Sequence, residues 1–265
     1  MNGMRVILVP VADRPECVFA LEAAFRLATR HGANVVGCHV RPHRADNARL
    51  NSVAARALFG GSAKEAGFRL SKRPRAGGAL LAIWHEMLGT PDRILAICGP
   101  VADLSVLSRP KPKGAGTARE FLLATLFNSA RPVLILPQRR IGRLGMRILI
   151  AWNQRPEAAL AVAAALPLLQ EAEQVTIVTC GPEDRPGPKA THLRDYLAHW
   201  DVRTDHLRTR GRSAEDEIAR SYHDMGADLL VMGAYSRHRM RERIFGGVTE
   251  VMLFHSNLPV LMYHP

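Results

Sequence analysis

The residues of this chain best suited to chemistry lie in a glycine-bounded loop near its end. Gly233 closes an apolar run, Gly246 and Gly247 open the next helical pattern, and Thr249 adds a hydroxyl. Glycine lets backbone N–H groups approach an anion closely, and a helix N-terminus contributes positive partial charge. The loop also carries the cations Arg237, Arg239, Arg241 and Arg243. The pattern favours phosphate binding, and the alternative is a loop that only turns the chain twice.

The strands and helices that must position this loop come in a repeated series. The runs MRVILVPV (4–11) and MRILIAWN (146–153) are short, apolar and β-branched, which is typical of buried strands. Each is followed by Arg-Pro-Glu and an Ala/Leu-rich helical pattern. Pro15 and Pro156 fit the first turn of a helix, where a missing N–H costs nothing. The chain therefore reads as an internal duplication.

The two halves also end alike, in SARPVLILP (129–137) and SNLPVLMYHP (256–265). We expect two domains, at residues 1–142 and 143–265. In the first, strands are expected near 4–10, 34–40, 79–86, 103–108 and 132–136, and helices near 15–30, 46–66, 91–98 and 117–128. In the second, strands are expected near 147–152, 174–180, 203–209, 228–233 and 259–263, and helices near 155–171, 189–200, 213–225 and 242–255.

Two local signals refine this assignment. Ser213, with Asp216 three residues later, predicts a helix N-cap, whereas Gly60-Gly61 is expected to break the second helix. Alternating strands and helices of this length predict an α/β fold, with a doubly wound, Rossmann-like parallel sheet in each half. Ligands of such sheets bind beyond the carboxyl ends of the strands, at the topological switch point. If the first and fourth strands of the second half are neighbours, their ends face one crevice.

Composition limits the class of protein. A chain of 265 residues, 47% hydrophobic, can bury a large core. No apolar run approaches the ~20 residues of a membrane helix, and the N-terminus lacks the apolar segment of a signal peptide. We therefore expect a cytoplasmic protein without membrane association. Residues 1–142 carry a net charge of +12 and the remainder none, but the arginines are dispersed with few aromatic residues among them. A solvated basic surface is favoured over nucleic-acid binding.

The four cysteines form no C-x-x-C pair, and the eleven histidines form no H-E-x-x-H motif. Neither a zinc site nor a thioredoxin-like motif is therefore indicated. Cys38 and Cys180 each end an apolar run, and we expect them to be buried small hydrophobic residues. No catalytic constellation stands out.

Taken together, the duplicated β-α-β units, the strand DLLVMGAYS, the segment FGGVTEVML and the ending NLPVLM resemble a tandem universal stress protein. The resemblance spans the whole chain and is strongest over residues 226–263. It implies two adenine nucleotide alpha hydrolase-like domains in a stress-response regulator that binds ATP or AMP rather than an enzyme. It also implies that the halves pair internally through PVLILP and PVLMY, and that two chains assemble as a homodimer.

The sequence departs from the family's binding pattern. Nucleotide-binding members carry G-x-x-G, nine residues, then G-[Ser/Thr], and here the same spacing joins Gly233, Ser236, Gly246 and Gly247. Two of the four positions are changed, and Thr249 partly replaces the lost hydroxyl. The resemblance predicts a nucleotide site at Ala151, Asn153, Gly233, Ser236, Gly246, Gly247, Val248 and Thr249.

Two positions of the family pattern can also be compared with the first half. Asn153 stands where members often carry an aspartate, and in the first half Asp13 lies near the equivalent place. Ser108 replaces the first glycine of the motif there. The resemblance therefore implies that the first half has lost nucleotide binding.

Three hypotheses remain open from the sequence. The first is a stress regulator that binds an adenine nucleotide in the second half. The second is a nucleotide-free family member that acts through an unknown protein partner, which the two altered motif positions favour. The third is a slow ATPase or a nucleic-acid binder that uses the basic first half.

Overall fold

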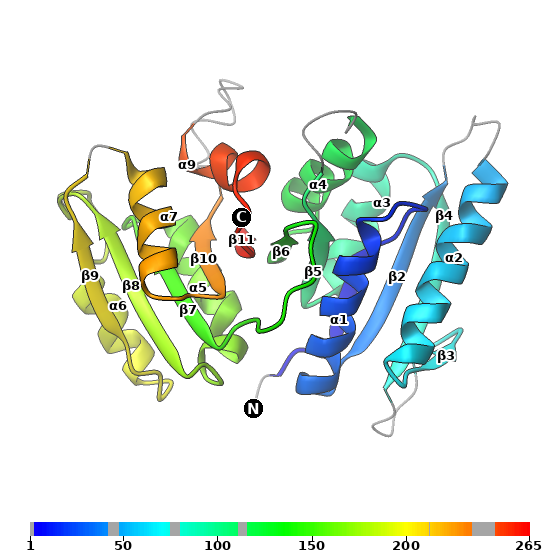
Figure 1. Ribbon diagram of the computed structural model, residues 1–265, viewed down its shortest axis with the longest axis horizontal. Helices are drawn as coiled ribbons and strands as arrows, with labels where there is room; N and C mark the ends of the chain where they lie inside the picture. The colour runs from blue at the N-terminus through cyan, green and yellow to red at the C-terminus, as the bar shows by residue number, and fades with distance from the viewer. Residues whose placement is uncertain (1–2, 42–47, 75–79, 111–115, 212, 235–246) are drawn as a thin grey trace. The chain divides into compact units, whose positions relative to one another are not determined.

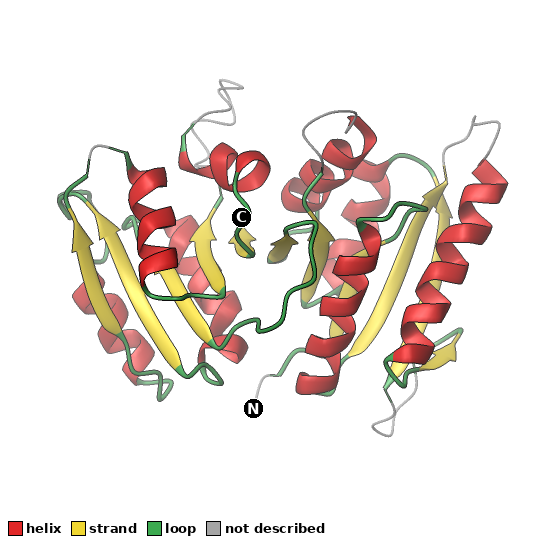
Figure 2. Cartoon of the chain, in the orientation of Figure 1, coloured by secondary structure: helices red, strands yellow, loops and turns green. Residues whose placement is uncertain are grey.

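The computed structural model describes residues 3–41, 48–74, 80–110, 116–211, 213–234 and 247–265. The chain forms two compact units, Met1–Ile141 (the first unit) and Gly142–Pro265 (the second unit). Each unit is an α/β domain whose strands run parallel, with helices on both faces of the sheet (Figure 2). The fold class expected from the sequence is confirmed.

The described residues of the first unit form six strands in the order β3-β4-β2-β1-β5-β6. The strands are β1 (Val6–Pro10), β2 (Asn34–Arg41), β3 (Arg69–Ser71), β4 (Leu81–Leu88), β5 (Leu104–Ser108) and β6 (Val133–Leu136). The helices are α1 (Cys17–His31), α2 (Ala48–Glu65), α3 (Pro91–Cys98) and α4 (Gly116–Asn128), with a short 3-10 turn, η1 (Gly99–Val101), after α3. Helices α1 and α2 lie on one face, and α3 and α4 lie on the other (Figure 1).

In the second unit, the part that the structure describes forms five strands in the order β11-β10-β7-β8-β9. They are β7 (Arg147–Ala151), β8 (Gln174–Cys180), β9 (Asp205–Thr209), β10 (Leu229–Gly233) and β11 (Val260–Tyr263). The helices are α5 (Pro156–Leu169), α6 (Ala190–Ala198), α7 (Ala214–Asp224) and the turn α9 (Val248–Glu250), which continues as the π-type turn η2 (Val251–His255). In Figure 1, α5 and α6 lie behind the sheet and α7 lies in front. The switch point is between β7 and β10, which pair in parallel as expected.

Most of the predicted elements are confirmed to within two residues, and the exceptions have physical causes. Ser213 caps α7 by accepting a hydrogen bond from the Asp216 N–H at 3.2 Å, as predicted. The predicted break at Gly60-Gly61 is wrong, because α2 runs unbroken through both glycines. The buried residues Ala55, Phe59 and Ala63 hold that face of the helix in the core, which outweighs the cost of about 1 kcal/mol for each glycine.

Two further elements differ from the prediction. Strand β3 was not predicted, since its side chains are mostly exposed and carry no apolar signal. The last helix, expected over 242–255, is described only from Val248 onward, and residues 242–246 lie outside the described part of the chain.

In each unit, an aspartate connects the first strand, β1 or β7, with the neighbouring strand that pairs with it, β5 or β10. In the first unit, the Asp103 carboxylate accepts hydrogen bonds from the backbone N–H groups of Arg5 (2.7 Å) and Val6 (2.9 Å). In the second, the Asp228 carboxylate accepts from Met146 (3.0 Å) and from the neighbouring residues on either side. Both aspartates stand directly before the inner strand that pairs with the first strand, β5 or β10. Each carboxylate therefore fixes where the first strand of its unit begins.

We predict that Asp228→Ala lowers the free energy of unfolding of the second unit by about 1–3 kcal/mol, because several backbone donors lose a charged acceptor. Chemical denaturation of the full chain measures the change. Asp224→Ala, at an exposed position on the last turn of α7, is the matched control and should leave stability nearly unchanged. Equal stability of the two variants would contradict the clamp.

Among the described residues, no helix is both long enough and apolar enough to cross a membrane.

Candidate functional site

A cavity of about 390 Å³ opens at the switch point of the second unit. It lies beyond the carboxyl ends of β7, β8 and β10, where the fold places ligands, and its volume is in the range of small-molecule sites. It is lined by Ala151, Trp152, Asn153, Gln154, Arg155, Glu157, Val178, Thr179, Cys180, Pro182, Glu183, Asp184, Arg185, Ala214, Ile218, Met232, Gly233, Ala234, Val248 and Thr249.

Two loops that form the cavity wall are locked together. The side chain of Gln154 is 4% exposed, and its Nε2 donates to the carbonyl of Arg185 at 3.1 Å, while its Oε1 accepts from the Arg185 N–H at 3.3 Å. The Trp152 indole N–H donates to the Pro188 carbonyl at 2.8 Å. A Cβ at Gly187 would overlap the Gln154 carbonyl oxygen, so only glycine fits there. These contacts within the chain therefore form the cavity wall without the help of a ligand.

Gln154 holds this position with a left-handed backbone, at φ 63°. Such a conformation is uncommon for a residue with a side chain and persists where the surroundings enforce it. The enforcement here comes from the buried side-chain amide, which satisfies its donor and acceptor against the opposite loop. The turn after β7 is thereby bent toward the loop after β8.

The cavity combines an apolar base with a polar rim. Val178, Ile218 and Met232 are buried apolar residues from β8, α7 and β10. Thr179 is held by a 2.9 Å hydrogen bond between its Oγ1 and the Nε2 of His206. A flat apolar ring with polar substituents matches such a lining.

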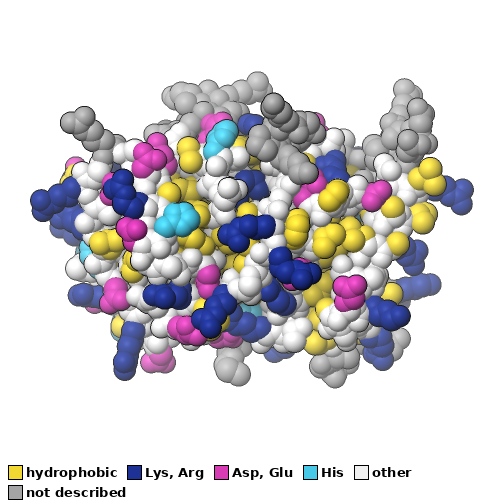
Figure 3. Space-filling view, viewed as in Figure 1, with side chains coloured by type: hydrophobic (Ala, Val, Ile, Leu, Met, Phe, Trp, Pro, Cys, Tyr) yellow, Lys and Arg dark blue, Asp and Glu magenta, His cyan; other side chains and the backbone are white. Residues whose placement is uncertain are grey.

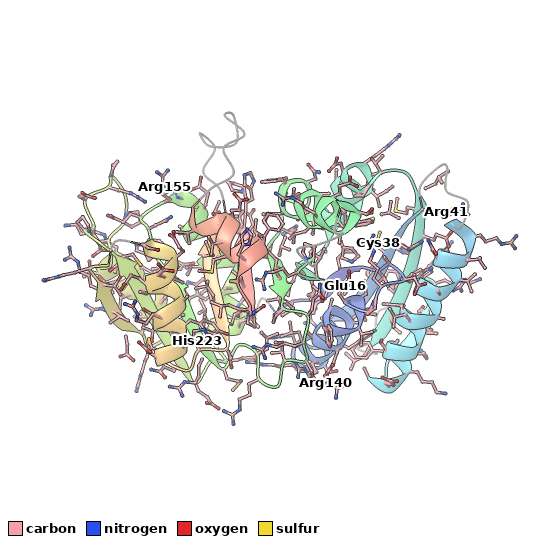
Figure 4. All side chains as sticks on the ribbon, turned by 45° about the horizontal axis from the view of Figure 1, so that its top comes forward. Glu16, Cys38, Arg41, Arg140, Arg155 and His223 are labelled. Carbon is pink, nitrogen blue, oxygen red and sulfur yellow. The ribbon has the colours of Figure 1, made fainter. Side chains whose placement is uncertain are left out.

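Asn153 lies exposed at the rim, where its side-chain oxygen accepts a hydrogen bond from the Arg155 N–H at 3.2 Å. This Asx turn leads into α5, whose first residue is Pro156. The Oδ1 of Asn153 thus accepts a hydrogen bond within the protein. Figure 4 labels Arg155, the residue directly before α5.

Gly233, at the end of β10, is required by packing. A Cβ at this position would lie 2.6 Å from the backbone N of Ala158 and 2.8 Å from the Cβ of Glu157. Both are closer than atoms of folded proteins approach, so the first turn of α5 could not lie against the strand. The close contact at Gly233 is therefore with the helix of the same unit.

The same contact buries Glu157 in the first turn of α5. Its residue is 8% exposed, it lines the cavity, and its Oε2 has no hydrogen-bond partner in the structure. A buried carboxylate oxygen without a partner is costly, and sites that bind ligands are where such groups occur. Glu157 is therefore the side chain in the lining with the strongest unmet demand for a hydrogen-bond donor.

The predicted site residues are partly assembled by the fold. Five of the eight line one cavity: Ala151, Asn153, Gly233, Val248 and Thr249. Gly247 begins the turn that carries Val248 and Thr249, with φ 77°, and is not itself in the lining. Ser236, Gly246 and the four loop arginines lie outside the described residues.

Several lining residues were missed by the sequence analysis. The sequence offers one signal for the importance of Glu157, which is its place in the repeated Arg-Pro-Glu tripeptide. The roles of Gln154 and Arg185 depend on a contact between two loops about thirty residues apart, which no local pattern reports. Cys180, expected to be buried, is half-buried at the cavity, and burial raises the pKa of its thiol.

The first unit differs at the equivalent point. Strand register pairs Leu8 with Ser105 and Leu149 with Leu230, so Ser108 corresponds to Gly233. The Ser108 hydroxyl donates to the Glu16 carbonyl at 2.6 Å. Helix α1 begins only at Cys17, whereas α5 begins at Pro156. The expectation that Pro15 lies in the first turn of α1 is therefore wrong: Pro15 precedes the N-cap residue Glu16, whose carbonyl is held by Ser108.

The comparison with protein families gives one match within the second unit. The model of the universal stress protein family matches residues 189–264, which include the end of β10 and the turn at Val248–Thr249. Over these residues the second unit is similar to the universal stress protein family. None of the curated proteins matches the chain.

Solved universal stress proteins extend the likeness in fold to the whole chain. One from Archaeoglobus fulgidus superposes with a TM-score of 0.76 at 15% identity, covering 97% of this chain and 97% of that chain. A protein of unknown function from Pseudomonas aeruginosa has a TM-score of 0.63 at 18% identity, with 99% and 93% covered. At these identities the likeness shows the fold, which is the tandem, two-domain fold expected from the internal duplication.

We predict that Gly233→Ala destabilises the second unit by about 1–3 kcal/mol, because the added Cβ displaces the first turn of α5. Chemical denaturation of the full chain measures the loss. Gly61→Ala is the contrasting control, since an added Cβ at this exposed helix position meets nothing within 4 Å, and it should raise stability by up to about 1 kcal/mol. A Gly233→Ala chain as stable as the parent would refute the packing role.

Proposed function

We propose that the second unit is a nucleotide-binding regulatory domain that takes ATP or AMP into its cavity. The observation that carries this proposal is the meeting of five predicted site residues, drawn from β7, β10 and the Val248–Thr249 turn, around one preformed cavity at the switch point. Similarity to the universal stress protein family supports the same ligand class by resemblance.

The lining suggests how such a ligand is divided. The adenine ring suits the apolar residues Val178, Ile218 and Met232. The unpartnered Oε2 of Glu157 suits a donor, either a ribose hydroxyl or the adenine amino group. Thr249 offers its hydroxyl from the turn at the opposite wall, where the phosphates are expected.

The charged side chains of the described lining favour contact with the nucleoside part of the ligand over contact with its phosphates. The lining contains three carboxylates, of Glu157, Glu183 and Asp184, and two cations, Arg155 and Arg185. Carboxylates repel phosphate groups, so this part of the cavity selects hydroxyl and amino donors rather than a triphosphate. A regulator that binds and releases its ligand, rather than an enzyme, is the function that we propose.

A nucleotide-free protein that acts through a protein partner is the second candidate. Its support is the Asn153 oxygen, which is committed to the turn before α5, together with the excess of carboxylates in the lining. Assembly of two chains as a homodimer remains part of this proposal. Nucleic-acid binding is not favoured, since Figure 3 shows Lys and Arg interspersed with Asp and Glu on the face in view.

The first test is a calorimetric titration of the full chain with ATP, AMP and adenosine. We expect one site per chain, with Thr249→Val weakening AMP binding about tenfold through the loss of one hydrogen bond to a charged group. Thr191→Val, at an exposed position of α6, is the matched control and should bind as the parent does. Absence of binding at millimolar ligand would reject the proposal in favour of the partner-binding candidate.

We predict that Glu157→Gln raises the stability of the protein without ligand but weakens ligand binding. Replacing the buried, unpartnered carboxylate with an amide removes an uncompensated charge, so the empty protein should become more stable by about 1 kcal/mol. Adenosine and AMP binding should weaken, because a carboxylate accepts hydrogen bonds more strongly than an amide does. Thermal unfolding with and without AMP measures both effects, and a loss of stability without ligand would contradict the assigned role.

A further inference from the structure

Three sulfur atoms meet inside the first unit, far from the cavity in sequence. Cys38 lies in β2, and Cys98, the last residue of α3, packs against the core cluster that contains Cys38. The Cys98 thiol also donates to the Met87 sulfur, in β4, at 3.3 Å. Residues about sixty positions apart thus pack together in one core cluster.

This sulfur cluster (Cys38, Met87 and Cys98) sits in an apolar environment with one accessible member. Cys38 is fully buried, at 0% exposed, and Figure 4 labels it within the first unit. The two cysteines and Met87 share a core cluster with Leu8, Val40, Ile94, Leu95, Ala102 and Ala124. Cys98 is half-buried, so a small reagent has access to its sulfur while Cys38 is shielded.

The two thiols differ in acidity because of their contact. The hydrogen bond from Cys38 stabilises the Cys98 thiolate and lowers the pKa of Cys98 to about 7. The same hydrogen bond, followed by burial, raises the pKa of Cys38. An accessible thiolate beside a shielded protonated thiol is the arrangement of an attacking cysteine with its resolving partner.

We propose that Cys38 and Cys98 form a redox modification site that a small hydroperoxide oxidises to a reversible intramolecular disulfide. The contact between the two sulfurs supplies the proximity, the half-burial of Cys98 supplies the entry point, and the apolar surroundings exclude larger oxidants. Nothing in this inference depends on nucleotide binding in the second unit.

The chemistry needs only the hydroperoxide as oxidant. The Cys98 thiolate attacks one peroxide oxygen, the O–O bond breaks, and the leaving hydroxide takes a proton to become water. The Cys98 sulfenic acid that results is attacked by the Cys38 sulfur, which gives up its proton. The S–O bond breaks as the S–S bond forms, and the departing hydroxide takes that proton as a second water. Two sulfurs are oxidised and two peroxide oxygens are reduced.

The other two cysteines lack this arrangement and serve as internal comparisons. Burial raises the pKa of Cys17, at the start of α1, and also the pKa of Cys180, at the end of β8. The Cys17 sulfur accepts from the Ala12 N–H at 3.5 Å, and the Cys180 thiol donates to the Ala214 carbonyl at 3.9 Å. Neither of these contacts involves a second sulfur, so neither thiol is set up for a disulfide.

The test treats the reduced full chain with hydrogen peroxide, followed by tryptic digestion without reductant and mass spectrometry. Cleavage after Arg44 and after Arg93 places the two cysteines in separate peptides. We expect one cross-linked pair, Cys38 with Cys98, lighter than the two peptides by about 2 Da and separated again by dithiothreitol. Cys17→Ser and Cys180→Ser chains should form the same cross-link, and Cys98→Ser should abolish it.

A second measurement keeps the proposal open to refutation if a variant folds poorly. The rate of Cys98 alkylation in the parent should rise with pH through a midpoint near 7. Cys38→Ala removes the thiol donor and should move that midpoint upward by about one unit or more, whereas Cys38→Ser keeps a donor and should move it less. Oxidation of Cys98 to sulfinic acid with Cys38 still reduced, oxidation of Met87 alone, or cross-links between chains would each overturn the proposal.

Discussion

The organisation of the second unit depends on one contact without a side chain, that of Gly233 with the first turn of α5. Because the end of β10 carries no Cβ, the helix start lies directly against the strand, 2.6 Å from where a methyl group would stand. That placement buries Glu157 and fixes the turn after β7 over the switch point. In the first unit a serine at the equivalent place bonds to the chain before α1, and the helix begins later.

Around this contact the cavity wall is held by protein rather than by ligand. Gln154, in a left-handed conformation, couples the turn after β7 to the loop after β8, and Trp152 adds a second hydrogen bond between the same loops. A wall made in this way loses little conformational freedom when a ligand enters, which is the physical content of preorganisation. The Oε2 of Glu157, which has no hydrogen-bond partner, is the complementary feature, because a ligand that donates a hydrogen bond to it would remove the cost of leaving it unpaired.

The sequence was sufficient to predict the alternation of strands and helices, the duplication and the switch point, because buried parallel strands have short apolar sequences. It was insufficient where tertiary contacts decide. Strand β3 has no apolar signal, and the α2 glycines are held in the helix by Phe59 and its neighbours. The burial of Glu157, the backbone of Gln154 and the meeting of Cys38 with Cys98 all arise between segments that no local pattern connects.

The paired aspartates Asp103 and Asp228 give the duplication a use as a controlled comparison. Both copies of the unit retain the carboxylate that begins the first strand, while the residue at the end of the adjacent strand is glycine in one copy and serine in the other. The chain thus contains its own reference: features common to both copies report what folding demands, and features held by one copy report what specialisation has added. By that measure the aspartate at the start of each unit belongs to the fold, whereas the glycine at the end of β10 is particular to the second copy.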